Sequence, residues 1–218
     1  MGTISVNKLG GLALVVGPII GLISYLIRPG GGIVGGSVDP TNAKAAIGAL
    51  IANADLANIS LFLGPIGAIL LLFGIQSLVK NVLKGGNGEA LGSLGTLMIL
   101  FVVIAWVITA GLSQSIAGQS AGAATGALYA ATLAIQVSVG IIGAIGFLLV
   151  TLAASTNDFF NKNFTLGAAL AAAVGLVAAL VGGFDLSLLY TMNYVSGIAW
   201  LVLTVWSITV GLSLMKKA

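Results

Sequence analysis

The chain has 218 residues, of which 59% are hydrophobic and only 6% are charged, and its formal net charge at pH 7 is +3. A soluble domain carries about 25% charged residues, so this composition excludes a mostly water-facing surface. The basic residues are scattered, which gives no indication of a nucleic-acid partner. The sequence predicts an integral membrane protein surrounded by the lipid bilayer.

Two residue types that carry much of protein chemistry are missing, because the chain contains neither cysteine nor histidine. This excludes disulfides, thiolate metal sites, His-ligated haem or zinc and His-based proton transfer within the chain. No two carboxylates have a spacing that suggests acid–base catalysis. We therefore expect no cofactor and no enzyme activity, with a membrane enzyme as the least favoured alternative.

Six apolar runs are long enough to cross a bilayer core, which requires roughly 20 residues per helix. The predicted all-α bundle has spans at residues 9–27, 56–79, 91–112, 126–152, 165–184 and 194–214. The first run follows Lys8 as in a signal peptide. It ends in Arg28-Pro29 without a small-x-small cleavage site, so we interpret it as a retained helix.

A glycine-rich stretch at residues 29–36 follows the first span, and Asp39-Pro40 comes next. We interpret this stretch as a flexible linker, because the sequence context of a phosphate-binding loop is absent. Asp39 and Pro40 are typical of a helix N-terminus. Apolar residues at helical spacing then predict a short interfacial helix at residues 40–53, with one long second helix as the alternative.

With six spans, both termini lie on one side of the membrane. Arg28 and Lys44 fall on the opposite side, together with polar loops at residues 113–124 and 185–193. The terminal side holds six lysines, namely Lys8, Lys80, Lys84, Lys162, Lys216 and Lys217. By the positive-inside rule, the chain is a multi-pass cell-membrane protein with cytoplasmic N- and C-termini.

Two lines of small residues with a spacing of four lie in or beside the fourth and fifth spans. Their members are Gly122, Gly126, Ala130 and Ala134 in the first, and Gly167, Ala171, Gly175 and Ala179 in the second. Small residues at i and i+4 let two helices approach closely, so that van der Waals packing holds them together. We expect both lines to pack inside the bundle. A surface for another membrane subunit, or for self-association, is the alternative.

Four polar residues are candidates for a site. They are Gln136 near the middle of the fourth span, Gln76 and Gln114 near helix ends, and Asp185 between the last two spans. A glutamine at the membrane centre must face protein or water, because lipid cannot satisfy its amide. We favour an interhelical hydrogen bond for Gln136, with contact to a solute as the alternative. Asp185 enters the membrane only if the fifth span ends later than expected.

The order of segments also resembles a known group of proteins. The segment LGGLALVVGPIIGLISYLIRPG is followed by Asp39-Pro40, by the alanine-rich AKAAIGALIANADLA and by five further spans. In this layout the chain resembles the uncharacterised six-helix bacterial and archaeal membrane proteins grouped under domains of unknown function. The resemblance implies a six-helix membrane fold and brings no known activity.

These features together favour a non-enzymatic protein with a structural or accessory role in a membrane complex. The small-residue lines and the missing metal-binding residue types support it. A small transporter or channel for a neutral solute is the alternative. It is favoured by Gln136, by Pro18 and Pro65 within the first two spans, and by the sequence IGAI, which occurs at residues 66–69 and 142–145.

Overall fold

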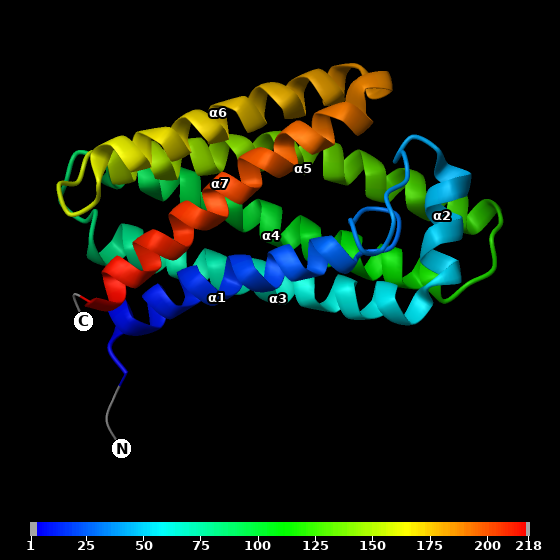
Figure 1. The fold of residues 1–218 in the computed structure, drawn as a ribbon, viewed down its shortest axis with the longest axis horizontal. Coiled ribbons are helices and arrows are strands. Elements are labelled where there is room, and N and C mark those ends of the chain that lie inside the picture. Colours follow the sequence, from blue (N-terminus) through cyan, green and yellow to red (C-terminus); the bar gives the residue numbers. More distant parts are fainter. Residues whose placement is uncertain (1–3, 217–218) are drawn as a thin grey trace.

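Six long helices run side by side in alternating directions in the computed structural model, which describes residues 4–216 (Figure 1). They are α1 (Val6–Ile27), α3 (Ala54–Asn81), α4 (Glu89–Ala117), α5 (Ala123–Ser155), α6 (Lys162–Phe184) and α7 (Leu189–Lys216). Two short helices, α2 (Ala43–Ala52) and η1 (Leu186–Leu188), lie in the connections. Each long helix is apolar and long enough to cross a membrane, which confirms the predicted six-span all-α bundle.

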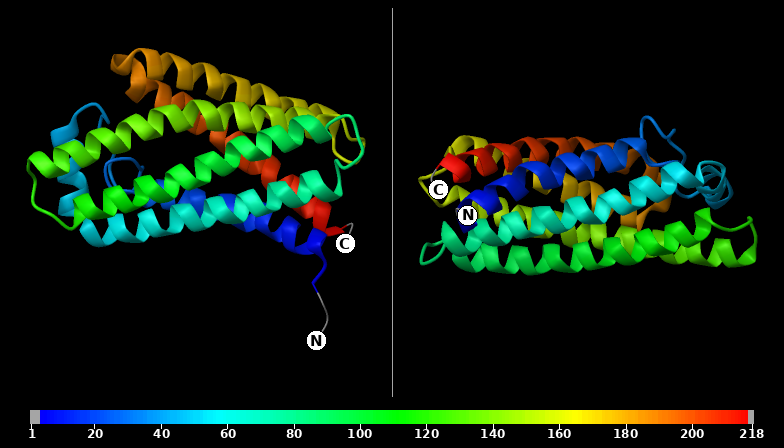
Figure 2. Two further views of the ribbon diagram at one scale, coloured as in Figure 1. Left: turned by 180° about the vertical axis from the view of Figure 1, so that it is seen from behind. Right: turned by 90° about the horizontal axis from the view of Figure 1, so that it is seen from below.

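The six long helices form a closed ring in the order α1, α3, α4, α5, α6 and α7, and α7 returns to α1 (Figure 2). Large apolar side chains fill the ring, and those of Leu14 and Trp206 are fully buried at 0% exposure. Trp200 of α7 lies against Trp106 of α4 and Phe147 of α5, with ring centroids 5.9 and 4.8 Å apart. The first and last helices are therefore parts of one core.

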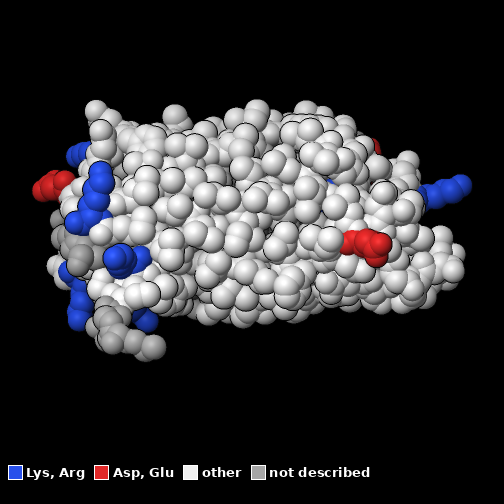
Figure 3. Space-filling view, turned by 60° about the horizontal axis from the view of Figure 1, so that its bottom comes forward, with Lys and Arg blue, Asp and Glu red and all other residues white. Residues whose placement is uncertain are grey.

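Charged side chains lie at the two ends of the ring and leave an uncharged belt between them on the face that Figure 3 shows. The exposed side chains midway along the helices are large and apolar, as at Phe101 of α4 and Leu170 of α6, which suits contact with lipid. The end that holds the start of α1 and the end of α7, called the terminal end below, carries Lys8, Lys80, Lys84, Lys162 and Lys216. Lys217 lies outside the described residues.

The opposite end, called the α2 end, is uneven because the helices differ in length. Helix α5 has 33 residues and α6 has 23, so their lengths are about 50 and 35 Å. Because residues 156–161 join them at the terminal end, α5 extends about 15 Å beyond α6 (Figure 1). Helix α2 lies across the extended ends of α3, α4 and α5, and it buries Ile47 and Leu50 there.

Helix α2 confirms the predicted short helix but begins later than expected. Its cap is Asn42, whose side-chain oxygen accepts a hydrogen bond from the Ala45 amide at 3.1 Å. Asp39 accepts instead from the amide and hydroxyl of Thr41, at 2.8 and 2.7 Å. Between α2 and α3, Asn53 has φ −127° and ψ 46°, which is not helical, so the alternative of one long helix is wrong.

Two connections are shorter than predicted. Helix α4 continues to Ala117, and only residues 118–122 separate it from α5. The extra turn is stabilised because Ile116 and Ala117 are buried in a cluster with side chains of α2. Helix α7 begins at Leu189 rather than Tyr194, directly after η1.

The glycine-rich stretch after α1 is an ordered cap rather than a flexible linker. The amide of Gly32 donates to the Arg28 carbonyl oxygen, and that of Val34 donates to the Leu26 carbonyl oxygen, both at 2.9 Å. The last carbonyl groups of a helix have no partner inside the helix, and these amides supply one. A Cβ at Gly32 would collide with the carbonyl oxygens of Tyr25 and Leu26, so the cap requires glycine at this position.

Candidate functional site

A close contact between α1 and α3 uses small residues with a spacing of seven. They are Gly10, Gly17 and Ser24 in α1, and Ser60, Gly67 and Gly74 in α3. The Ser24 hydroxyl donates to the Ser60 carbonyl oxygen at 2.6 Å, and a Cβ on Gly17 would lie 2.8 Å from the Gly67 carbonyl oxygen. A spacing of four identifies only Gly17, with Gly21, and Ser60, with Gly64, in this set. The spacing of seven, repeated in both helices, is the signal that identifies the contact.

The small-residue line of α5 lies on the surface of the bundle rather than inside it. Three of its members are exposed, namely Gly122, Ala130 and Ala134. Gly126 is partly buried, yet no atom lies within 4 Å of the place where its Cβ would stand. The reason is the shorter neighbouring helix, because Gly183 in the last turn of α6 already lies beside Val137. Helix α6 ends before it reaches most of the line.

The line of α6 lies partly inside the bundle. Gly175 is buried, and a Cβ there would lie 3.3 Å from Ala199 of α7. Ala171 and Ala179 are partly buried, whereas Gly167 is exposed and has no atom near its Cβ position. Four residues turn a helix by about 400°, so the line drifts by about 40° per step and leaves the contact face.

The polar candidates do not come together in one site. Gln76 lies near the terminal end of α3, and Gln114 lies near the α2 end of α4. Asp185 is exposed after the end of α6, and its carboxylate accepts from the amide and hydroxyl of Ser187 at 3.0 and 2.6 Å. Among residues 4–216, no three Asp or Glu side chains gather as a metal site would need.

Gln136 is partly buried in α5, and no hydrogen bond joins its amide to another described residue. The next residue, Val137, lies beside Gly183, so Gln136 is level with the last turn of α6 rather than with the middle of that helix. One turn further along α5, Gly140 is exposed and has no atom within 4 Å of its Cβ position. The amide of Gln136 therefore lies beside a segment with open space.

A group of residues around Arg28 was not recognised from the sequence. Arg28 directly follows α1. The phenol groups of Tyr25, one turn earlier, and of Tyr129 in α5 lie near enough to influence its pKa. The Tyr129 hydroxyl also donates to the Pro40 carbonyl oxygen at 2.8 Å, which ties α5 to the segment before α2. Burial lowers the pKa of Arg28, because its charged form loses hydration. The available signal was that Arg28 is the single arginine among lysines.

A second polar group joins the start of α7 to the glycine-rich stretch. The hydroxyls of Tyr190 and Tyr194 lie 2.8 Å apart, and each lies 3.4 Å from the hydroxyl of Ser37. The two tyrosine rings pack edge to face with centroids 5.1 Å apart. These three hydroxyls are therefore hydrogen-bond partners of one another.

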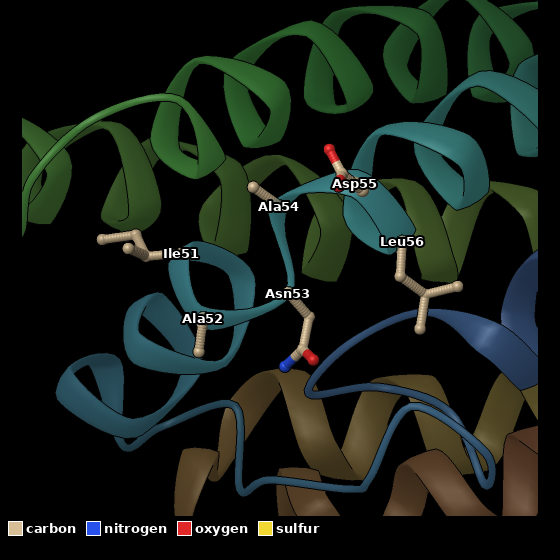
Figure 4. A pocket seen from close by; sticks show the side chains of 6 residues that line it. All are labelled: Ile51, Ala52, Asn53, Ala54, Asp55 and Leu56. Carbon is tan, nitrogen blue, oxygen red and sulfur yellow. The ribbon is translucent and has the colours of Figure 1, made fainter.

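A shallow hollow of about 430 Å³ lies at the bend between α2 and α3 (Figure 4). Its lining residues are Ile51, Ala52, Asn53, Ala54, Asp55 and Leu56. Their side chains point in different directions in Figure 4, and the Asn53 amide already donates to the Ala49 carbonyl oxygen at 3.2 Å. The hollow thus differs from a ligand site, in which a few polar groups converge.

Comparison with known proteins identifies no relative of this chain. No protein-family model, curated protein or solved structure matches the chain. The resemblance to six-helix proteins of unknown function therefore stays a prediction, and function must be argued from the residues themselves.

Proposed function

We propose that this protein is a non-enzymatic subunit of a membrane complex and that one face of α5 receives a helix of the partner. The face, called the α5 small-residue face below, consists of Gly126, Ala130, Ala134 and Ser138. The main support for the proposal is that this face is largely exposed, because the neighbouring helix α6 ends near the level of Val137.

The chemistry of the face suits a helix better than it suits lipid chains. In a bilayer, helices associate through van der Waals packing, and small residues allow the backbones to approach closely. Elsewhere the exposed surface carries bulky side chains, as at Leu170 and Val177 of α6, which are 67% and 60% exposed. Small residues with a spacing of four face the same direction for about three steps, after which the helix has turned them away. A face of this length suits one partner helix that crosses α5 at an angle.

Native mass spectrometry of the protein, extracted gently from its own membrane, tests the proposal. We expect reproducible co-migration with another subunit, and we expect Ala134→Leu to abolish it, because the added side chain fills the space that the partner backbone needs. Gly111→Leu in α4 is the matched control, since Gly111 is also exposed and has no atom within 4 Å of its Cβ position. A lone monomer, or equal effects of the two substitutions, contradicts the proposal.

Passage of a small neutral solute is the second candidate function, and Gln136 favours it. Its amide has no partner among the described residues, and Gly140 beside it has open space. Stopped-flow light scattering of proteoliposomes with urea and glycerol tests this candidate. A transport role predicts that Gln136→Leu abolishes solute flux in a folded protein, whereas the control Gln114→Leu retains it. Equal flux in both variants and the wild type removes Gln136 as a solute contact.

The proposal includes an orientation with both termini in the cytoplasm. It is supported by the lysines at the terminal end, against Arg28 and Lys44 at the α2 end. The chain has no cysteine, so single cysteine substitutions give a clean signal. In intact cells, we expect a membrane-impermeant maleimide to label Lys44→Cys and to spare Lys84→Cys. The reverse pattern contradicts the orientation.

A further inference from the structure

We propose that Arg28 and Tyr25 bind a phosphate oxyanion at the α2 end of the bundle. The inference is independent of the subunit role, because it concerns a different helix and a different kind of ligand. It rests on the surroundings of the guanidinium group, on the hydrogen-bond donors that remain free there, and on the level of Arg28 along the bundle.

Arg28 has no counter-charge in the described part of the chain. No hydrogen bond or ion pair joins its guanidinium to another residue there, and the titratable groups close enough to influence its pKa are the phenols of Tyr25 and Tyr129. Of the three carboxylates at this end, Asp39 bonds Thr41 and Asp185 bonds Ser187, and no ion pair joins Asp55 to Arg28. A cation that is partly withdrawn from water without a counter-charge is unfavourable. An anion that binds there supplies the counter-charge that the chain lacks, so its binding is favoured.

The backbone of Arg28 is also held in place by the cap. The residue is partly buried, and its Cδ lies 3.5 Å from the point where a Cβ on Gly31 would stand. Its own carbonyl oxygen accepts the amides of Gly31 and Gly32, at 3.2 and 2.9 Å. The cap therefore fixes the backbone of Arg28, and the side chain starts beside the cap with no partner for its charged head in the described chain.

Both free polar groups at this place can donate hydrogen bonds. A guanidinium has five N–H donors and no acceptor. The hydroxyl of Tyr25 adds another, because it has no hydrogen-bond partner among the described residues. The Tyr129 hydroxyl already donates to Pro40, and those of Tyr190 and Tyr194 bond each other. A ligand made of acceptors alone, such as a phosphate group, matches this set, and the planar guanidinium binds it through two parallel hydrogen bonds.

The level of Arg28 along the bundle favours phosphate over other anions. Arg28 is the first residue after α1, where the apolar part of that helix ends, and phospholipid phosphates lie at this depth of a bilayer. The same group reaches the site either on a lipid headgroup or as free phosphate. Both sources present the same oxygens to Arg28 and Tyr25.

The test measures the thermal unfolding midpoint, Tm, of purified, delipidated full-length protein in detergent at constant ionic strength. The probes are inorganic phosphate and short-chain dihexanoyl phosphatidylglycerol. A ligand that binds only the folded state raises Tm in a concentration-dependent way. We expect at least one probe to raise Tm in the wild type, and at least a tenfold higher concentration to be needed in Arg28→Lys, which keeps the charge but loses the paired donors. Lys44→Gln, which removes the other cation at this end, serves as the control and keeps the wild-type response.

A response to the lipid alone assigns the site to a headgroup, and a response to both probes assigns it to phosphate in either form. Tyr25→Phe removes one donor and supplies a milder variant, for which we expect a weaker response at an unchanged ligand-free Tm. No response in the wild type overturns the proposal. Equal responses in the wild type, Arg28→Lys and Lys44→Gln overturn it as well.

Discussion

The hydroxyl of Ser207 in α7 donates a hydrogen bond to the carbonyl oxygen of Leu14 in α1, at 2.8 Å and across 193 residues of sequence. In an uninterrupted helix, the Leu14 oxygen accepts the amide of residue 18. That residue is Pro18, which has no N–H, so the oxygen is free inside a buried contact. Ser207 thus satisfies the carbonyl that the proline leaves open, and it does so where the last helix closes the ring onto the first.

This relationship predicts that Ser207→Ala lowers the free energy of unfolding by about 1–3 kcal/mol, because it leaves a buried carbonyl without a partner. Equilibrium unfolding in mixed detergent micelles measures the change. Ser213→Ala is the control, because the Ser213 hydroxyl bonds only to Thr209 of its own helix at 2.9 Å.

The double variant Pro18→Ala/Ser207→Ala extends the same test. Alanine at position 18 restores an amide to the helix, so it can bond the Leu14 oxygen without help from α7. We expect the double variant to recover much of the stability lost in Ser207→Ala, as a positive coupling in a double-mutant cycle. Strictly additive effects of the two substitutions are incompatible with this account.

Two glycines one turn apart in α1 should respond in opposite ways to alanine. A Cβ on Gly17 would lie 2.6 Å from the Leu71 amide nitrogen, and main-chain atoms have little freedom to move. Gly17→Ala should therefore destabilise the protein by about 1–3 kcal/mol. At Gly21 nothing lies within 4 Å of the Cβ position, so Gly21→Ala should be neutral or stabilising by up to about 1 kcal/mol. Unfolding in detergent distinguishes the two, and similar losses at both sites argue against the close contact of α1 with α3.

Neighbouring glycines in the cap of α1 give another matched pair. Gly32→Ala forces a methyl group against the carbonyl oxygens of Tyr25 and Leu26, so we expect it to open the cap. Gly31→Ala places its methyl group 3.5 Å from the Arg28 Cδ, which is an ordinary contact. Limited proteolysis should cut Gly32→Ala within residues 29–42 and leave the wild type and Gly31→Ala intact. Equal cleavage of the two variants contradicts the ordered cap.

The hydrogen bond from Tyr129 to Pro40 should hold α2 and the segment before it on the extended end of α5. Tyr129→Phe removes only this hydroxyl, and a bond of this kind contributes about 0.5–1.5 kcal/mol. Amide hydrogen exchange measured by mass spectrometry should become faster in residues 36–53 and stay unchanged in α6. Unchanged exchange in residues 36–53 would mean that the hydrogen bond from Tyr129 to Pro40 does not hold this segment on α5.

The number of spans, the short helix before the second span and the placement of charges at the two ends follow from the sequence alone. These properties are local, because a run of about 20 apolar residues bounded by charge or glycine forms a crossing helix whatever lies beside it. The absence of cysteine and histidine is also a property of the sequence alone, and it excludes thiolate and imidazole chemistry within the chain.

Which small residues meet another helix depends on how the helices are arranged in the bundle. The line through Ala130 and Ala134 has the spacing of a packing face, but the neighbouring helix ends beside Val137 and leaves much of it exposed. Likewise, the sequence contains Pro18, but the residue that satisfies its open carbonyl comes from the far end of the chain. The physical reason is that apolar length is a property of one segment, whereas a contact depends on the lengths and levels of two segments that the chain brings together.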